Sequence, residues 1–446
     1  MLVPDEAECI QSSMLNGDEV DVVILGAGMA GLAAARALAE RGIHVVLLEA
    51  KDRVGGRVFT RKAEGGGTVE LGAEFVHGRA PELWALIEEC GAKTVERDGT
   101  TLREQWGGGV AEDDPQDATM FEPLEKLENF AGEDVAFADW LAASDVPEDE
   151  RGTLLGYVEG FNAADARRIG VKALGVQQKA EDAIEGDRAW HVRGGYEQLA
   201  KYLAARVKEL GGNVRLNCEV LGVTWREGLV EVATSAGLLR AAKCVVALPL
   251  GVLQAGFKIE PEPQAMLAAR RLEMGHAVRF TMVFRERWWL GSKAVEKDKL
   301  AAMSFLFTPQ RDVKVWWTAH PEAQAQPALT GWVGGPRAMA LEGKSAGELG
   351  REACAMLAAA FGVAEDLVRA QLVTTYAHDW SGDRFTRGAY SYVPAGAIDA
   401  PAAMARGEAG TLFFAGEHTD VTGHWGTVHA ALRSGLRAAE QVLGEK

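Results

Sequence analysis

The chain has 446 residues, of which 48% are hydrophobic and 25% are charged. This length favours two domains, and this composition is typical of a globular enzyme with a large core. The 47 lysines and arginines are outnumbered by 64 aspartates and glutamates, which leaves a formal net charge of −17. Such an acidic chain argues against nucleic-acid phosphate as a partner and is compatible with cationic ligands.

Cysteine usage and hydropathy predict a cytoplasmic protein without a metal site. The cysteines are scattered, odd in number and without C-x-x-C spacing, which suits reduced thiols. No stretch reaches roughly 18 consecutive apolar residues, so we expect no membrane span. Residues 1–19 contain acidic side chains but no lysine or arginine, unlike a secretory signal peptide, and we expect them to form a loose arm.

The segment that follows this arm reads as strand, glycine turn, helix and strand. An apolar run over residues 21–25 predicts a buried parallel strand, and residues 32–41 predict a helix. Between them stand three glycines in the spacing G-x-G-x-x-G, and residues 44–48 predict a second apolar strand. A lone glycine motif is weak evidence, but this order of elements favours a dinucleotide site.

The three glycines and an acidic residue each have a role in such a site. Gly26 allows the tight turn, Gly28 has no Cβ to block a pyrophosphate, and Gly31 lets the helix pack closely on the sheet. Free N–H groups at the helix N-terminus attract phosphate. Glu49, at the end of the second strand, would accept hydrogen bonds from an adenosine ribose. An ordinary strand–helix–strand unit with glycines at its turns is the alternative.

Two further N-terminal segments carry candidate site residues. Arg53–Arg57 would be a second phosphate-contacting element, which a simple nicotinamide-binding fold does not need, and Arg57 could place its guanidinium on a pyrophosphate. Val69–Gly78 runs from a strand into a turn of small residues, where the backbone could approach a flat ring. His77 in this turn is either a site residue or a hydrogen-bonded histidine of the core.

The sequence pattern changes at the start of the middle part of the chain. Between Pro81 and Trp190, short amphipathic stretches with acidic loops predict an inserted helical region rather than more sheet. A helix is expected from Tyr196 to about Leu210, because apolar residues recur on one face. Residues 218–247 alternate in the pattern of a small antiparallel sheet.

A second sheet is indicated by the alternation in residues 278–284. This alternation places Arg279 on the face opposite Phe280. The tryptophan pairs at 288–289 and 316–317 are expected to fill a second core, because a tryptophan stripe is more often packing than a ligand cage.

The C-terminal segment also has the pattern of a nucleotide-binding site. Residues 411–417 read as a strand, a small turn and an acid, and residues 426–429 open a helix that ends near Gly444. A second helix N-terminus so far along the chain could cap the far end of a long cofactor. This arrangement fits FAD better than NAD.

Taken together, these segments resemble the flavin-containing amine oxidases, which include monoamine oxidases, polyamine oxidases and lysine-specific histone demethylases. The matches cover most of the chain and keep the family's order. The helical region at about 100–190, which usually shapes the substrate cavity, matches least. The matching segments are Gly26–Gly31 with Glu49, Arg53–Arg57, Glu70–Gly78, Pro249–Leu253, Gly388–Tyr392, Phe414–Thr419 and Gly426–His429.

The resemblance implies an α/β fold with two domains. A Rossmann-like FAD-binding domain would be assembled from residues 20–80, 191–265 and 400–446, and a substrate domain of sheet plus helices from 81–190 and 266–399. It also implies oxidation of a primary or secondary amine. The flavin would accept a hydride from the C–N bond, the imine would hydrolyse, and O2 would reoxidise the flavin and form H2O2.

The resemblance further implies which residues contact FAD and how FAD is held. Ala389 stands where monoamine oxidases attach the flavin to a cysteine, so we expect non-covalent FAD. Val220 would act through its backbone near the adenine. The expected contacts are Gly26, Gly28, Gly31, Glu49, Arg57, Gly72, Ala73, Glu74, Val220, Gly416, Glu417, Thr427 and Val428.

The catalytic residues implied are Arg279, Tyr390, Thr427 and His77. Monoamine oxidases place the amine between two tyrosines, and here Tyr390 matches one while Thr427 stands at the other, as in the histone demethylases. The family's lysine, which holds a water against the flavin, aligns with Arg279. Arginine keeps the positive charge but cannot act as a base, because its pKa is above about 12. The alternative for Arg279 is a salt-bridged arginine on an ordinary strand.

The sequence is compatible with three functions. The first is an FAD-dependent amine oxidase whose partners are a small-molecule amine and O2, with no nucleic acid or membrane partner and a possible homodimer. The second is a flavin-dependent C–C desaturase or isomerase of the carotenoid or porphyrinogen type. The third is an FAD-bound binding protein with lost turnover, which the unusual Arg279 makes plausible.

Overall fold

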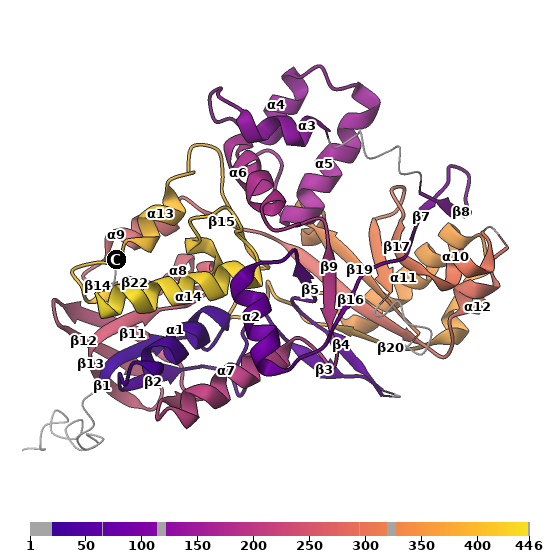
Figure 1. The fold of residues 1–446 in the computed structure, drawn as a ribbon. Coiled ribbons are helices and arrows are strands. Elements are labelled where there is room, and N and C mark those ends of the chain that lie inside the picture. The colour runs from indigo at the N-terminus through magenta and orange to yellow at the C-terminus, as the bar shows by residue number, and fades with distance from the viewer. Residues whose placement is uncertain (1–19, 65, 114–121, 294, 319–326, 445–446) are drawn as a thin grey trace, which may run out of the picture.

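Two large sheets stand side by side, and a group of helices lies above them (Figure 1). The expected loose arm of residues 1–19 lies outside the described residues. The computed structural model describes residues 20–64, 66–113, 122–293, 295–318 and 327–444.

The first sheet has eight strands in the order β10-β2-β1-β13-β12-β11-β14, with β22 paired to β13. β10, β2, β1 and the end of β13 run parallel, whereas β11, β12 and the start of β13 are antiparallel. Both the expected parallel strands and the small antiparallel sheet are therefore confirmed, as parts of one sheet. Its strands are β1 (Val20–Leu25), β2 (Val45–Leu48), β10 (Asn213–Arg215), β11 (Val220–Arg226), β12 (Leu229–Thr234), β13 (Gly237–Val246), β14 (Ile259–Glu260) and β22 (Leu412–Phe414).

Helices cover this sheet on both faces. Val22 and Ile24 of β1 pack into one core, and Val23 and Leu25 pack into the other, which explains the uninterrupted apolar run. The first core is formed with α1 (Met29–Glu40), α2 (Pro81–Cys90), α7 (Glu197–Glu209) and α14 (Val428–Leu443). The second is formed with α8 (Leu250–Gln254), α9 (Gln264–Ala269) and α13 (Ala400–Ala405).

The second sheet has seven strands in the order β20-β16-β19-β18-β17-β7-β8. Its β16 confirms the predicted alternation, because Phe280, Met282 and Phe284 enter a core that Arg279 does not enter. Its elements are β7 (Thr100–Glu104), β8 (Val110–Glu112), β16 (Ala277–Phe284), β17 (Met303–Phe307), β18 (Val315–Thr318), β19 (Ala328–Gly334) and β20 (Leu372–Ala377), with α10 (Lys297–Ala301), α11 (Ala346–Phe361) and α12 (Glu365–Gln371).

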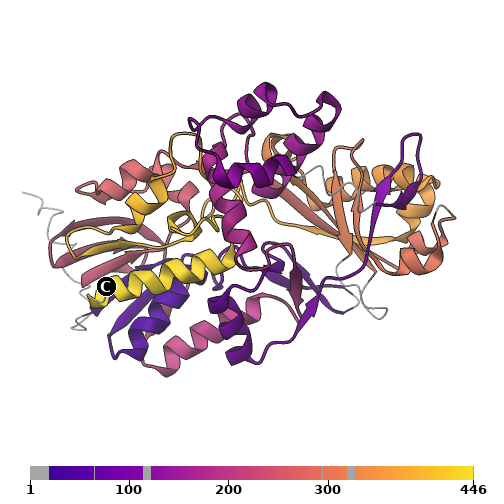
Figure 2. The ribbon, with the colours of Figure 1, turned by 45° about the horizontal axis from the view of Figure 1, so that its top comes forward.

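The helical group between residues 122 and 182 lies above the two sheets in Figure 2, and its buried apolar side chains form a core of their own. It contains α3 (Glu122–Glu125), α4 (Phe137–Ala143), α5 (Glu148–Asn162) and α6 (Val171–Asp182). The expected helices are thus present in this part of the chain.

The same prediction is wrong for residues 94–112, which contain strands. β6 (Thr94–Glu96) pairs with β9 (Ala189–Val192), and β9 pairs in turn with β5 (Phe75–His77). β7 lies between β8 and β17 in the second sheet and runs parallel to β17, some 200 residues away in sequence. Strands of three to five residues are too short for alternation to identify them, and the partners of β6 and β7 are distant in sequence.

Two short strand pairs complete the fold near the cavity described below. β3 (Thr60–Lys62) pairs with β4 (Thr68–Glu70), and β15 (Glu273–Met274) pairs with β21 (Ser391–Tyr392). No helix in the described part of the chain is both long and apolar enough to cross a bilayer. The division of the chain into two domains at the stated boundaries stays a prediction.

Candidate active site

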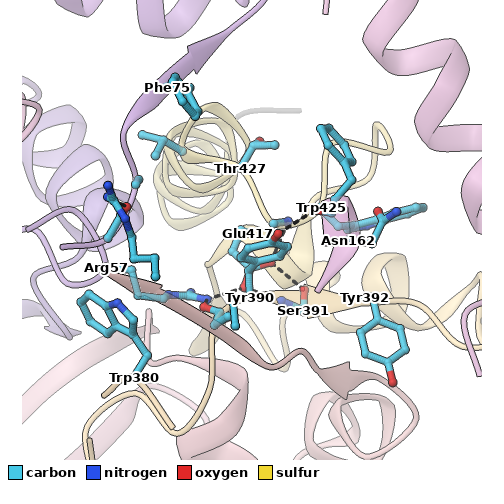
Figure 3. A pocket seen from close by; sticks show the side chains of 18 of the residues that line it. Arg57, Phe75, Asn162, Trp380, Tyr390, Ser391, Tyr392, Glu417, Trp425 and Thr427 are labelled. Atoms are coloured by element: carbon cyan, nitrogen blue, oxygen red, sulfur yellow. Dashed lines mark hydrogen bonds and ion pairs between the residues drawn. The ribbon is translucent and has the colours of Figure 1, made fainter. Parts of the chain in front are cut away.

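A cavity of about 1780 Å³ reaches from the glycine turn after β1 to the N-terminus of α14. Residues of both large sheets and of the helical group line it, and Figure 3 shows part of the wall. Fifteen of the sixteen candidate site residues line this cavity. The exception is Gly31, where a Cβ would lie 2.0 Å from the Gly26 carbonyl oxygen, so this glycine serves the packing of α1 on the sheet.

The glycine turn leaves backbone open to the cavity. A Cβ at Gly28 would meet no protein atom within 4 Å, so no neighbouring protein atom requires the glycine there. No side chain caps the first turn of α1, whose N-cap is Gly28. Uncapped N–H groups beside an unfilled space form a site for an anion such as phosphate.

Glu49 is buried at the other side of this turn. Its Oε2 accepts a hydrogen bond from the Ala27 N–H at 2.9 Å, and its Oε1 accepts one from the Lys51 N–H at 2.9 Å. Burial raises its pKa, although the two backbone donors act in the opposite direction. A carboxylate has about four acceptor sites, so Glu49 can still accept hydrogen bonds from a ligand in the cavity.

Arg57 and Glu417 form an ion pair between segments 360 residues apart. The Arg57 Nη1 donates to Glu417 Oε1 at 2.8 Å and to the Ala389 carbonyl oxygen at 2.8 Å. Burial alone would raise the pKa of Glu417, but Arg57 and the Ser391 hydroxyl outweigh it and lower that pKa. Figure 3 shows this cluster on the cavity wall, where the sequence predicted two separate ligand contacts.

Arg279 and Glu74 form a second buried ion pair at the cavity. The Arg279 guanidinium donates to Glu74 Oε2 and, at 2.7 Å, to the Gly72 carbonyl oxygen. The Trp317 indole N–H donates to the same Glu74 oxygen at 2.9 Å. Burial tends to raise the pKa of Glu74, but Arg279 and His191 lower it overall. Arg279 is therefore both salt-bridged and part of the cavity wall, so the two sequence interpretations of this residue are compatible.

Tyr390, which precedes β21, and Thr427, the N-cap of α14, each make a side-chain hydrogen bond. The Tyr390 hydroxyl donates to the Phe161 carbonyl oxygen at 2.6 Å, and its ring lies parallel to Trp332 with centroids 6.5 Å apart. The Thr427 Oγ1 caps α14 by accepting from the Ala430 N–H at 3.1 Å. Both line the cavity (Figure 3), and only the ring of Tyr390 presents an extended flat surface.

The imidazole of His77 lies in the wall and makes no hydrogen bond with a described residue. Its ring makes edge contacts with Phe75 and Phe161, at centroid distances of 5.7 and 6.1 Å. Burial lowers its pKa to about 4, so the imidazole is neutral at pH 7. The interpretation of His77 as a hydrogen-bonded core histidine does not fit these contacts.

Sequence reasoning missed several aromatic residues of the wall. Trp317 was assigned to the second core, and this was wrong: Trp316 lies in that core, whereas Trp317 faces the cavity. Strand alternation within β18 could have separated the two, because neighbouring side chains point to opposite faces. Phe75, Trp332 and Phe161 also line the cavity. Among the described residues, no group of three or more histidines, cysteines or carboxylates could hold a metal.

Comparisons with known proteins place this geometry in a family. The family model described as flavin containing amine oxidoreductase matches residues 29–150 and 141–443. The chain is 29% identical to polyamine oxidase 3 of Oryza sativa subsp. japonica, over 94% of this chain and 88% of that one. It is 26% identical to a flavin-containing amine oxidase of Oncorhynchus mykiss, over 95% of this chain and 86% of that one.

Solved structures agree on the fold. A wild-type putrescine oxidase bound to putrescine superposes with a TM-score of 0.81 at 23% identity, covering 96% of this chain and all of that one. Cyclohexylamine oxidase from Brevibacterium oxydans superposes with a TM-score of 0.79 at 21% identity, over 96% and 99%. These likenesses confirm the expected α/β fold, a Rossmann-like domain with a second domain of sheet plus helices. Because the family model covers nearly the whole described chain, this protein belongs to the flavin-containing amine oxidoreductase family.

Proposed function

We propose that this chain is an FAD-dependent oxidase of primary or secondary amines that uses O2 as its electron acceptor. The observation that carries the proposal is the continuity of the cavity. It joins an open nucleotide-type turn at one end of the chain to an aromatic wall around Tyr390. Bound FAD would supply a ring that accepts a hydride from the carbon beside the amine nitrogen and passes the electrons to oxygen.

The residues around the cavity fit non-covalent FAD. The open backbone at Gly28 and the uncapped start of α1 suit the pyrophosphate, and Glu49 suits the ribose. At the other end, the first turn of α14 at Val428 lines the cavity and can face the ring. Ala389 has no thiol to form a covalent bond with the flavin.

The amine would lie against Tyr390. The ring of Tyr390 is held by its hydroxyl and by Trp332, so it can orient a substrate with little loss of side-chain entropy. Phe75 and Trp317 extend the apolar wall and exclude water from the reacting carbon. His77, neutral at pH 7, can accept a hydrogen bond from an ammonium group at a free ring nitrogen, but its lowered pKa makes it a weak base.

Arg279 would supply a fixed positive charge to this site. Its guanidinium is oriented by Glu74 and Gly72 and cannot change orientation without breaking a buried ion pair. A preorganised cation stabilises negative charge that develops beside it during electron transfer. The competing C–C desaturase or isomerase and the binding protein without turnover are not favoured by the relatives, which are named as amine and polyamine oxidases.

Glu49→Ala is expected to weaken FAD binding. The loss of charge-assisted hydrogen bonds of about 1.5–3 kcal/mol corresponds to a dissociation constant roughly 10- to 100-fold higher. Fluorescence titration of the apoprotein with FAD measures this constant. The control is Asp52→Ala, which removes an exposed carboxylate three residues away and should leave the constant unchanged. Equal effects of the two changes would contradict a contact at Glu49.

Arg279→Met is expected to destabilise the protein by leaving Glu74 buried without its ion-pair partner, at a cost of about 3–5 kcal/mol. The double change Arg279→Met with Glu74→Gln removes both charges and should cost clearly less than the sum of the single changes. Denaturant unfolding of the four proteins measures this coupling. Additive costs would show that the two residues act independently.

The double variant also tests the electrostatic role of Arg279. If its charge assists oxygen reduction, the folded double variant should reoxidise about tenfold more slowly for each 1.4 kcal/mol lost. Stopped-flow mixing of the reduced protein with O2 measures this rate. Reoxidation as fast as in the wild type would leave Arg279 with a structural role alone.

Anaerobic addition of amines should bleach the flavin of the wild-type holoprotein. Tyr390→Ala should retain FAD but reduce at least about tenfold more slowly, if the ring contributes about 1.4 kcal/mol to holding the amine. Tyr390→Phe keeps the ring and loses only the hydrogen bond to Phe161, so it should stay closer to the wild type. Reduction by polyenes or porphyrinogens and not by amines would contradict the proposed function, and loss of FAD in Tyr390→Ala would make Tyr390 a core residue.

A further inference from the structure

Arg279 and Glu74 line a second, much smaller cavity as well as the large one. This small cavity has a volume of about 20 Å³. Roughly 10–15 Å³ of such space is enough for one water molecule, so the small cavity has room for one. Residues of β16 and β19 in the second sheet and of the short strands β4 and β9 line it, and its polar side chains include Glu70, Glu74, His191, Arg279, Thr281 and Thr330.

The buried guanidinium of Arg279 leaves one nitrogen without a partner. Arg279 is only 3% exposed, and its Nη1 and Nη2 donate to the Gly72 carbonyl oxygen and to Glu74 Oε2. Its third nitrogen, Nε, is inaccessible and has no acceptor among the described residues. A buried N–H without an acceptor is costly, and native structures seldom leave one unpaired. An acceptor in the small cavity, which Arg279 lines, would complete the guanidinium.

Thr281 and Thr330 supply a second unused donor to the small cavity. They lie opposite each other on β16 and β19, and their Oγ1 atoms are 2.9 Å apart. Each hydroxyl has one hydrogen, and only one of the two hydrogens can lie between the two oxygens. Within the described part of the chain, no further hydrogen bond of either side chain uses the other hydrogen. Both residues are buried, so this hydrogen also needs an acceptor.

Glu74 offers an acceptor on the same wall. Its Oε2 receives Arg279 and the Trp317 indole, whereas its Oε1 has a longer contact of 3.4 Å with His191 Nδ1. Arg97 can only donate, and its Nη1 lies 2.8 Å from His191 Nε2, so Nε2 accepts and the neutral ring carries its hydrogen on Nδ1. A carboxylate oxygen accepts two hydrogen bonds, so Glu74 Oε1 can accept a further one.

The charges of this wall favour a neutral occupant. The positive charge of Arg279 is balanced by Glu74. Burial raises the pKa of Glu70 to about 8, so this carboxyl is mostly neutral at pH 7. A cation in the small cavity would face Arg279 and an anion would face Glu74, each at a desolvation cost. A water molecule can accept two hydrogen bonds and donate two, which matches the donors and the acceptor on the wall.

We propose that the small cavity binds one water molecule, which fixes the Arg279 guanidinium by accepting its Nε–H and donating to Glu74 Oε1. Thr281 and Thr330 are then positioning residues, because they hold the water and act only through Arg279. With this water, all three nitrogens of the guanidinium have fixed acceptors, so its charge keeps one place in the wall of the large cavity. The water site does not require the flavin, whereas its effect on a bound flavin rests on the proposed function.

The first test compares crystal structures of the wild type, Thr330→Val and Thr330→Ile at a resolution that shows ordered water. The wild type should hold one water within hydrogen-bond distance of Arg279 Nε and Glu74 Oε1. Thr330→Val is the matched control, because it keeps the shape of the side chain and leaves the Thr281 hydroxyl to hold the water. Thr330→Ile adds a carbon that reaches further into the cavity, so it should displace the water and change the orientation of the guanidinium.

The second test measures the two-electron midpoint potential of the flavin in the same three holoproteins. A fixed cation favours the negatively charged reduced flavin, so a displaced guanidinium should lower the potential. We expect Thr330→Ile to lower it by about 30 mV or more, which corresponds to a tenfold loss of relative stabilisation, and Thr330→Val to stay within about 10 mV of the wild type. A purely structural role of Thr330 would change the stability of the protein and leave the potential where it is.

Thr281→Ile fills the small cavity from the opposite strand and replaces Thr330→Ile if that variant does not fold. The proposal is overturned if the wild-type cavity is empty. It is equally overturned if the isoleucine variant displaces the water without moving Arg279 or the potential, or if the valine and isoleucine variants shift the potential equally. A wild type that binds no FAD would instead overturn the proposed function, while the crystal structures would still decide the water site.

Discussion

The ion pair between Arg57 and Glu417 holds together the segments that frame the cavity. Glu417 accepts hydrogen bonds from Arg57, from Ser391 and, at 3.0 Å, from the Gly426 N–H, which precedes α14. Arg57 also donates to the Ala389 carbonyl oxygen beside Tyr390. A single buried carboxylate therefore fixes the N-terminal segment, the start of α14 and the proposed amine site relative to one another. Such a pair specifies geometry more than it adds stability, because burying both charges has a large desolvation cost.

The ion pair between Arg279 of the second sheet and Glu74 likewise fixes several segments through one buried carboxylate. Here Trp317 and His191 share the carboxylate with the guanidinium. Arg97, which lies 2.8 Å from His191 through its Nη1, extends the network to the Ser304 and Thr318 carbonyl oxygens. A guanidinium with two fixed acceptors is a more rigid charge than a lysine ammonium. The Arg279 side chain thus supplies a fixed positive charge but cannot act as a base.

The sequence predicted the elements whose evidence is local. The glycine turn after β1, the alternation of β16 and the helix that begins after Thr427 are all confirmed, because each depends on periodicity or capping within a short segment. The strands β6 to β8 were missed because they are short, and because β6 and β7 pair with segments far along the chain while β8 pairs only with β7. Trp317 was misplaced, since two adjacent tryptophans suggested one core although a strand sends them to opposite faces.

The residues of the candidate site could be predicted from the sequence, but which of them form ion pairs with each other could not. The resemblance pointed to Arg57, Glu417, Glu74 and Arg279 separately, and only the fold shows that they form two pairs.

The central claim is that the two ends of this chain close around one dissociable FAD. Acid precipitation of the purified yellow protein, followed by chromatography of the released flavin, tests it most directly. The account predicts one FAD per chain in the supernatant, because the open turn at Gly28 suits a pyrophosphate and Ala389 offers no thiol. Flavin that stays with the denatured pellet, or FMN in place of FAD, would contradict it.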